Sequence, residues 1–138
     1  MKIRSGFVTN SSSTSFLIIS KDDLNKSDFF KLMGVSADSP IADLFSQLYR
    51  DVLDSSSVKI DFRVAPKDMP IERWFDRHRH GELSPRMWEK LREARKRGLK
   101  AYFGSLDSET SNIQTFFCTD SFEIESDKVY FNGLECVW

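Results

Sequence analysis

The chain has 138 residues and a formal net charge of −1, and 40% of its residues are apolar, including twelve Phe and three Trp. This length suits one domain and this composition fills one hydrophobic core, which excludes an intrinsically disordered chain. The near-zero net charge excludes a global attraction to nucleic acid or anionic lipid, so such binding would need a local patch. We therefore expect a single domain over residues 1–138.

The N-terminal part predicts a loop, a strand and a short helix. Residues 5–15 are rich in Ser, Thr and Asn, whose side chains bond to nearby backbone groups and favour loops. Residues 15–20 are apolar and β-branched between polar neighbours, which indicates a strand. Ser27 is a typical N-cap residue and Gly34 a typical stop, so we expect a helix over 28–33.

A second helix and the clearest strand follow. Ser39-Pro40 is a start signal, because Ser caps a helix and Pro suits its first position. This helix is expected to end at Leu53, and its predicted apolar face consists of Ile41, Leu44, Phe45, Leu48 and Val52. Alternating hydrophobicity over 58–64 predicts a strand. Its buried face is expected to consist of Val58, Ile60, Phe62 and Val64.

Two further helices and a strand are predicted next. Residues 70–79 carry an apolar face at helical spacing. Ser84-Pro85 repeats the start signal and Gly98 supplies a stop, so a helix is expected over 85–97. Its predicted buried face consists of Met87, Trp88, Leu91 and Ala94. Residues 100–106 are predicted to form a strand.

The C-terminal part combines one ambiguous segment with a hairpin. Residues 111–119 fit a helix by the spacing of their apolar side chains and a strand by composition, and we favour the helix. Residues 122–124 and 129–131 flank a short polar turn, which indicates a β-hairpin. Strands separated by helices predict an α/β fold with a small mixed sheet, part parallel and part antiparallel, packed by about four to five helices.

The first sixteen residues follow a specific sequence pattern. Met-Lys-Ile-Arg-Ser-Gly-Phe-Val-Thr-Asn-Ser-Ser-Ser-Thr-Ser-Phe resembles an N-terminal signature of uncharacterised phage and prokaryotic proteins, Met-Lys-x-Arg-x-Gly-Phe-Val-Ser-Asn followed by a Ser run and Phe. Thr9 and Thr14 replace Ser and keep the hydroxyl group. The resemblance implies a mobile-element origin and no particular activity. For a phage protein, the compartment would be the host cytoplasm.

The same segment is a candidate ligand site. Clustered hydroxyl and backbone N–H groups can bind an anion, and a guanidinium can supply the charge. The candidate ligand-binding residues are Arg4, Gly6, Asn10, Ser11, Ser12 and Ser13. Two alternatives stay open: a loop whose hydroxyls satisfy its own backbone, and an exposed segment that a partner recognises. The lack of a Gly-Lys-Ser/Thr element favours the first of these over a phosphate loop.

Charge is distributed unevenly along the chain. Residues 72–100 hold ten Lys/Arg and five Asp/Glu, whereas residues 105–127 hold six acids and no base. A candidate patch for phosphate or an acidic partner consists of Arg86, Lys90, Arg92, Arg95, Lys96 and Arg97. Glu89 and Glu93 neutralise part of it at helical spacing. We therefore favour a solvated helix face that offsets the acidic segment over a nucleic-acid site, because no nucleic-acid motif accompanies it.

The remaining candidates would support metal chemistry. His80 lies at the expected end of a helix, and Asp107 and Glu109 follow a strand. These residues, with Asp120 and Glu123, could meet in space and bind a divalent ion as in nucleases. No catalytic motif surrounds them, so they are weak metal candidates and a metal-dependent phosphodiesterase or nuclease is the alternative function.

The sequence favours binding over catalysis. We expect a non-enzymatic accessory protein, without a cofactor, that binds a protein partner or a nucleotide-like, anionic ligand. Nucleic acid is the less favoured partner, and the oligomeric state stays open. No apolar run approaches the about 20 residues that span a bilayer, and no signal peptide is recognised, so we expect a cytoplasmic protein. Cys118 and Cys136 lack metal-ligand spacing and are expected to be buried thiols, with a disulfide between them left open.

Overall fold

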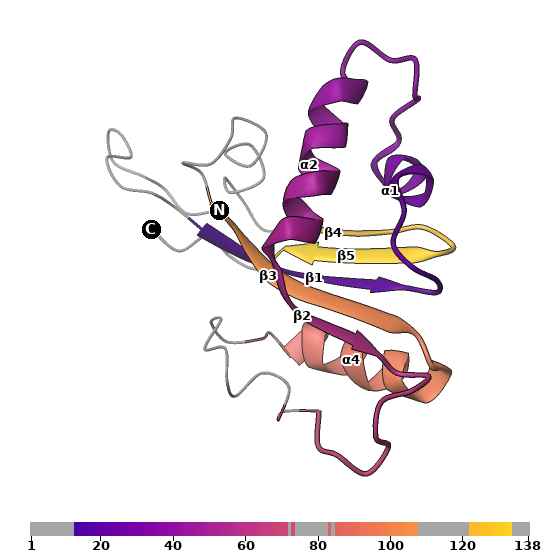
Figure 1. Ribbon diagram of the computed structural model, residues 1–138, viewed down its shortest axis with the longest axis vertical. Helices are drawn as coiled ribbons and strands as arrows, with labels where there is room; N and C mark the ends of the chain where they lie inside the picture. The colour runs from indigo at the N-terminus through magenta and orange to yellow at the C-terminus, as the bar shows by residue number, and fades with distance from the viewer. Residues whose placement is uncertain (1–12, 72, 74–82, 84, 108–121, 134–138) are drawn as a thin grey trace.

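A computed structural model describes residues 13–71, 73, 83, 85–107 and 122–133, which form one antiparallel sheet with helices on both of its faces (Figure 1). The described strands are β1 (Ser13–Ser20), β2 (Ser56–Asp61), β3 (Lys100–Asp107), β4 (Phe122–Glu125) and β5 (Val129–Gly133). The described helices are α1 (Lys26–Met33), α2 (Ala42–Ser55) and α4 (Pro85–Arg97). The mixed α/β class expected from the sequence is thus confirmed.

The sheet has the strand order β2-β3-β1-β5-β4 and each of its four pairings is antiparallel. The expectation of a partly parallel sheet was therefore wrong. The reason lies beside β2, where the Phe62 amide donates to the Leu99 carbonyl at 3.0 Å. Since α4 ends next to the end of β2, β3 begins there and must run in the opposite direction.

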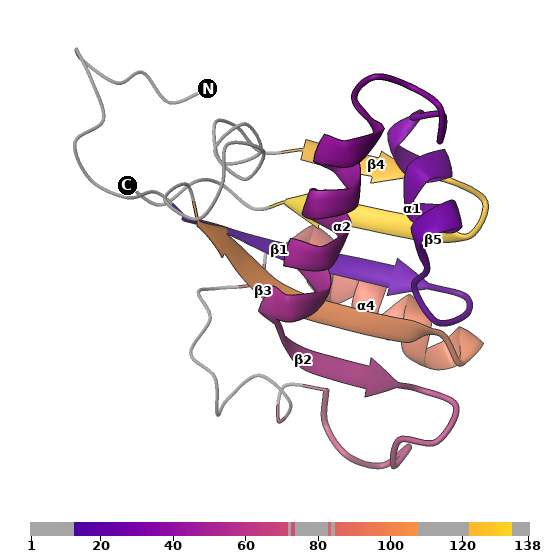
Figure 2. The ribbon, with the colours of Figure 1, turned by 45° about the horizontal axis from the view of Figure 1, so that its top comes forward.

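α1 and α2 lie on one face of the sheet and α4 on the other (Figure 2), and each face carries its own apolar core. α1 and α2 cover the face that contains Phe16 and Phe131, both fully buried. α4 covers the opposite face, where Leu17 packs in the same cluster as Met87 and Leu91. β1 supplies both cores because successive side chains of a strand point to opposite faces. The central strand is accordingly the near-continuous apolar run of the sequence.

Fewer helices are described than the four to five that we expected. The structure describes three, and the predictions for 70–79 and 111–119 fall mainly or wholly outside the described residues. The C-terminal hairpin is confirmed, because β4 and β5 pair across residues 126–128. Of the described helices, none is long and apolar enough to cross a membrane.

The start of α1 differs from the prediction. Asn25, and not Ser27, is the N-cap: its side-chain oxygen accepts a hydrogen bond from the Asp28 amide at 2.8 Å. Asn25 has the extended backbone that a capping residue needs, whereas Ser27 is already helical. Gly34 ends the helix as expected, in the left-handed conformation with φ of 70°.

α2 begins two residues after Pro40, and part of its predicted apolar face is exposed. Leu48 and Val52 are buried, but Ile41 is 46% and Leu44 51% exposed. The first turn of this segment is not yet helical, since the Ser39 hydroxyl accepts from the Ile41 amide at 3.3 Å and no side chain caps α2 itself. The predicted apolar face of α2 therefore included two residues at its N-terminal end that are in fact exposed, Ile41 and Leu44.

β2 is also shorter than predicted. Val58, Ile60 and Phe62 are buried as expected, but Val64 is 81% exposed. The amides of Val64 and Ala65 both donate to the Asp61 carbonyl, at 3.1 and 2.9 Å, and this turn ends the strand. Alternation in the sequence continues past Asp61, whereas the extended backbone does not.

Candidate functional site

α4 is held on the sheet by one row of side chains. Pro85 begins the helix, and Gly98 ends it in the left-handed conformation with φ of 67°. Met87, Leu91 and Ala94 are buried at helical spacing, so the predicted face is correct except that Trp88 is only half-buried. This row fixes the rotation of the helix and thereby sorts its cations into an inner and an outer set.

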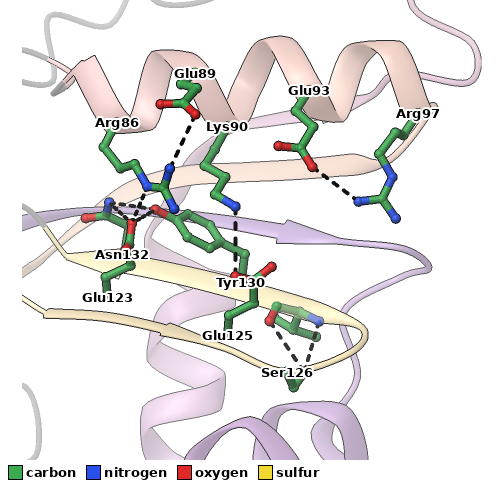
Figure 3. Close-up of polar contacts among 11 residues, drawn as sticks. Arg86, Glu89, Lys90, Glu93, Arg97, Glu123, Glu125, Ser126, Tyr130 and Asn132 are labelled. Carbon is green, nitrogen blue, oxygen red and sulfur yellow. Dashed lines mark hydrogen bonds and ion pairs between the residues drawn. The ribbon is translucent and has the colours of Figure 1, made fainter.

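The inner cations meet the acidic segment of the chain. The Arg86 Nε atom lies 3.0 Å from Glu123 Oε2, and the Lys90 Nζ atom lies 3.8 Å from Glu125 Oε2. Figure 3 shows both side chains extending from α4 toward the β4–β5 hairpin. Glu123 and Glu125 alternate on β4 and so point to the same face of the sheet. The basic helix and part of the acidic segment therefore neutralise each other within the molecule.

Tyr130 and Asn132 of β5 complete this cluster. The Tyr130 hydroxyl donates to Glu123 Oε2, and Asn132 Nδ2 donates to the Tyr130 oxygen at 2.8 Å. Lys90 Nζ stands 4.8 Å from the centroid of the Tyr130 ring, a cation–π geometry. Neither residue was among the site residues predicted from the sequence. Pairing the predicted hairpin in register would have placed Glu123 opposite Asn132.

The protonation of this cluster is fixed near neutral pH. Burial, followed by the hydrogen bond to Glu123, raises the pKa of Tyr130 from 10.0 to about 12. The Tyr130 hydroxyl, followed by Arg86, lowers the pKa of the Glu123 carboxyl. A general acid or base works best with a pKa near the working pH, and both groups are moved away from it. Near neutral pH Tyr130 therefore keeps its proton and Glu123 stays charged, and their contacts connect the hairpin to Arg86 and Lys90 of α4.

The raised pKa of Tyr130 predicts a loss of stability in alkali. Because the folded state holds the proton more tightly than the unfolded state, this contribution is complete below pH 10 and is lost as the pH rises from 10 to about 12. We expect absorbance titration at 295 nm to show one tyrosine that ionises near pH 12 and is absent from Tyr130→Phe. Ionisation of every tyrosine by pH 10 in the folded protein would contradict this arrangement.

The outer cations of α4 are only partly paired. Arg97 Nη1 lies 3.5 Å from Glu93 Oε1, and Arg95 donates to the Pro66 carbonyl at 3.2 Å and to the Lys67 carbonyl. Arg92 and Lys96 make no ion pair with any residue that the structure describes. Both are exposed and lie one helical turn apart. Within the described chain, Arg92 and Lys96 of the predicted six-residue patch thus have no partner, and Arg95 has carbonyl partners but no carboxylate.

Two hollows flank the sheet. One, with a volume of about 50 Å³, lies between α4 and the β4–β5 hairpin. The other, of about 220 Å³, lies on the side of α1 and α2 and is lined by Asp23, Lys59, Asp61, Lys100 and Tyr102, among others. Lys100 neutralises much of the acidic charge in the second hollow, because it pairs with Asp23 and its Nζ atom lies 3.8 Å from Asp61 Oδ2.

Of the N-terminal candidates, Ser13 alone falls within the described residues. Ser13 begins β1, and the other candidates lie outside the described residues: Arg4, Gly6, Asn10, Ser11 and Ser12. Their proposed anion binding therefore stays a prediction.

The metal candidates fall at the limits of the described chain. Asp107 is the last residue of β3, whereas His80, Glu109 and Asp120 lie outside the described residues, as do both cysteines. Glu123 is already bound to Arg86 and Tyr130. Within the described part of the chain, no group of three His, Cys, Asp or Glu side chains is arranged to hold a metal ion.

No protein-family model, no curated protein and no solved structure matches the chain.

Proposed function

We propose that this protein is a non-enzymatic accessory protein of a phage or mobile element, and that it binds an acidic protein partner through the outer surface of α4. The observation that carries this proposal is the division of the cations of α4. Arg86 and Lys90 are held by carboxylates of the hairpin, whereas Arg92 and Lys96 are exposed and make no ion pair with a described residue. A partner that supplies carboxylates there would complete the charge pairing of the helix.

An acidic protein suits this surface better than nucleic acid. Affinity for a duplex grows with the number of phosphates that a protein neutralises, and among the described cations of α4 only Arg92 and Lys96 lack a partner. Glu89 and Glu93 stand on the same helix with side chains 64% and 50% exposed, and they would repel a continuous phosphate backbone. A protein partner can place its carboxylates to meet the cations and avoid the glutamates.

Charge reversal of the outer cations tests the proposal. We expect the protein to bind a fluorescent oligo-glutamate peptide with an affinity that falls as salt rises. Arg92→Glu combined with Lys96→Glu should weaken binding by about tenfold or more, since it replaces two attractions by two repulsions. The matched control, Lys26→Glu with Lys31→Glu, makes the same change in net charge on α1, on the opposite face of the sheet.

Three outcomes would overturn this assignment. One is unchanged binding in the Arg92 and Lys96 variant, and another is an equal loss in the α1 control. Tighter binding to a DNA duplex than to oligo-glutamate would favour the nucleic-acid function instead. Separately, hydrolysis of DNA, RNA or cyclic nucleotides in Mg²⁺ or Mn²⁺ would remove the non-enzymatic part of the proposal.

A further inference from the structure

The hollow between α4 and the β4–β5 hairpin is lined by both charged and apolar side chains. The apolar side chains on the α4 face of the sheet are Ile19, Ala94 and Leu99, with the Tyr130 side chain beside them. In Figure 3 the hairpin turn at Ser126 lies below this space, and Glu93 and Arg97 of α4 lie above it.

Two lysines of this lining have no counter-ion within the described chain. Lys21 directly follows β1 and Lys128 directly precedes β5, at the end where these two strands pair. The Lys21 amide donates to the Lys128 carbonyl at 3.1 Å. The other cations of the lining are paired, Lys90 with Glu125 and Arg97 with Glu93.

These two lysines give the lining a positive excess. Asp127 is the remaining acid of the lining, so the unpaired charges there are Lys21 and Lys128 against one carboxylate. Like charges on neighbouring strand ends repel each other, and an anion between them removes that cost.

The size of the hollow limits what it can hold. Its volume is about 50 Å³, whereas sites that enclose drug-sized molecules have volumes of about 300 to 1,000 Å³. A nucleotide cannot be enclosed there, but one acidic group at the end of a side chain can enter. The hollow also opens on the side of the sheet that carries α4, the helix of the proposed partner surface.

We propose that this hollow is a subsite for a single carboxylate of the acidic partner, bound between the ammonium groups of Lys21 and Lys128. This inference rests on the proposed function and adds the chemistry of the partner: an Asp or Glu side chain enters the hollow while the outer cations of α4 meet further carboxylates. Phosphate is also a small anion that two ammonium groups can bind, so the test includes it.

The test is an NMR titration of the full chain with acetyl-Gly-Glu-Gly-amide, its Gln counterpart and inorganic phosphate. We expect the Glu peptide to shift the amide signals of Lys21 and of residues 126–129, with a dissociation constant on the order of 1 mM. The Gln peptide should cause no such shift. Phosphate binding as tight as that of the Glu peptide would assign the site to phosphate and overturn the carboxylate.

Two variants separate this subsite from the proposed α4 surface. Lys21→Gln with Lys128→Gln should weaken Glu-peptide binding by about tenfold or more. Arg92→Glu with Lys96→Glu should leave it within about twofold, because one carboxylate in the hollow does not require the outer cations. Amide spectra of both variants that overlay the parent spectrum away from the changed residues exclude misfolding.

The possible failures are distinguishable. If the hollow shows no Glu-specific shift while oligo-glutamate binding still depends on Arg92 and Lys96, the subsite is wrong and the proposed function stands. The charge-matched control for this subsite is Lys26→Gln with Lys31→Gln on α1. If this control weakens Glu-peptide binding as much as Lys21→Gln with Lys128→Gln does, the subsite is wrong, because the peptide then responds to the net charge of the protein alone.

Discussion

Gly104→Ala is expected to destabilise the protein by about 3 kcal/mol, the upper part of the usual range for overpacking. A Cβ atom at this position would lie 2.1 Å from the Ser55 carbonyl oxygen and 2.8 Å from its carbon. Gly104 pairs with Phe16 on one side and Ser56 on the other, so β3 is fixed from both sides. The clash is with backbone, which cannot rotate away as a side chain can. Relief would require the junction of α2 and β2 to move off the sheet.

Urea unfolding of Gly104→Ala beside Ser105→Ala measures this effect. Ser105 is the next residue on the strand and is exposed, so its substitution should change the free energy of unfolding by less than about 0.5 kcal/mol. A loss in Gly104→Ala no larger than that of the Ser105 control would show that α2 does not approach β3 as closely as described.

Phe131→Ala is expected to cost about 3 to 5 kcal/mol, the range for removing a large aromatic side chain from a core. Phe131 is fully buried on β5. Its ring centroid lies 6.0 Å from that of Phe16 in an edge-on arrangement and 6.1 Å from that of Phe29. The three rings join β5, β1 and α1, so the cavity would open where the helix meets the sheet.

The control for this core is Phe131→Leu, which keeps most of the apolar volume and should lose clearly less stability than Phe131→Ala. Both variants are compared by the midpoint of urea unfolding at constant slope. Equal losses in the two variants would mean that the volume of the ring is not packed, and a negligible loss in both would place Phe131 outside the core.

Local signals in the sequence predicted most of the elements. Pro85 and Gly98 delimit α4 as predicted, because helix initiation and termination depend on a few adjacent residues. The alternation of Val58 and Ile60 predicted β2 for the same reason, since one strand displays its two faces within a few residues. Where a neighbouring residue offered the same chemistry, as Asn25 does beside Ser27, the boundary was placed wrongly.

Strand direction and the polar cluster depend on contacts between distant residues. Helices between strands are typical of parallel crossovers, and it is the pairing of β2 with β3, together with the contact of Phe62 with Leu99, that shows the chain returning antiparallel. The opposed charges of α4 and the acidic segment were visible in the sequence. Which cations are paired is set by the register of β4 against β5 and by the rotation of α4, and neither follows from local spacing.

The most direct test of the account is a titration of the full chain with oligo-glutamate, followed through the side-chain NMR signals of the arginines and lysines of α4. The account predicts that Arg92 and Lys96 shift and saturate while Arg86, held at 3.0 Å from Glu123, does not move. Equal shifts at Arg86, or no shift at Arg92 and Lys96, would contradict the division of α4 into cations that the hairpin neutralises and cations left for a partner.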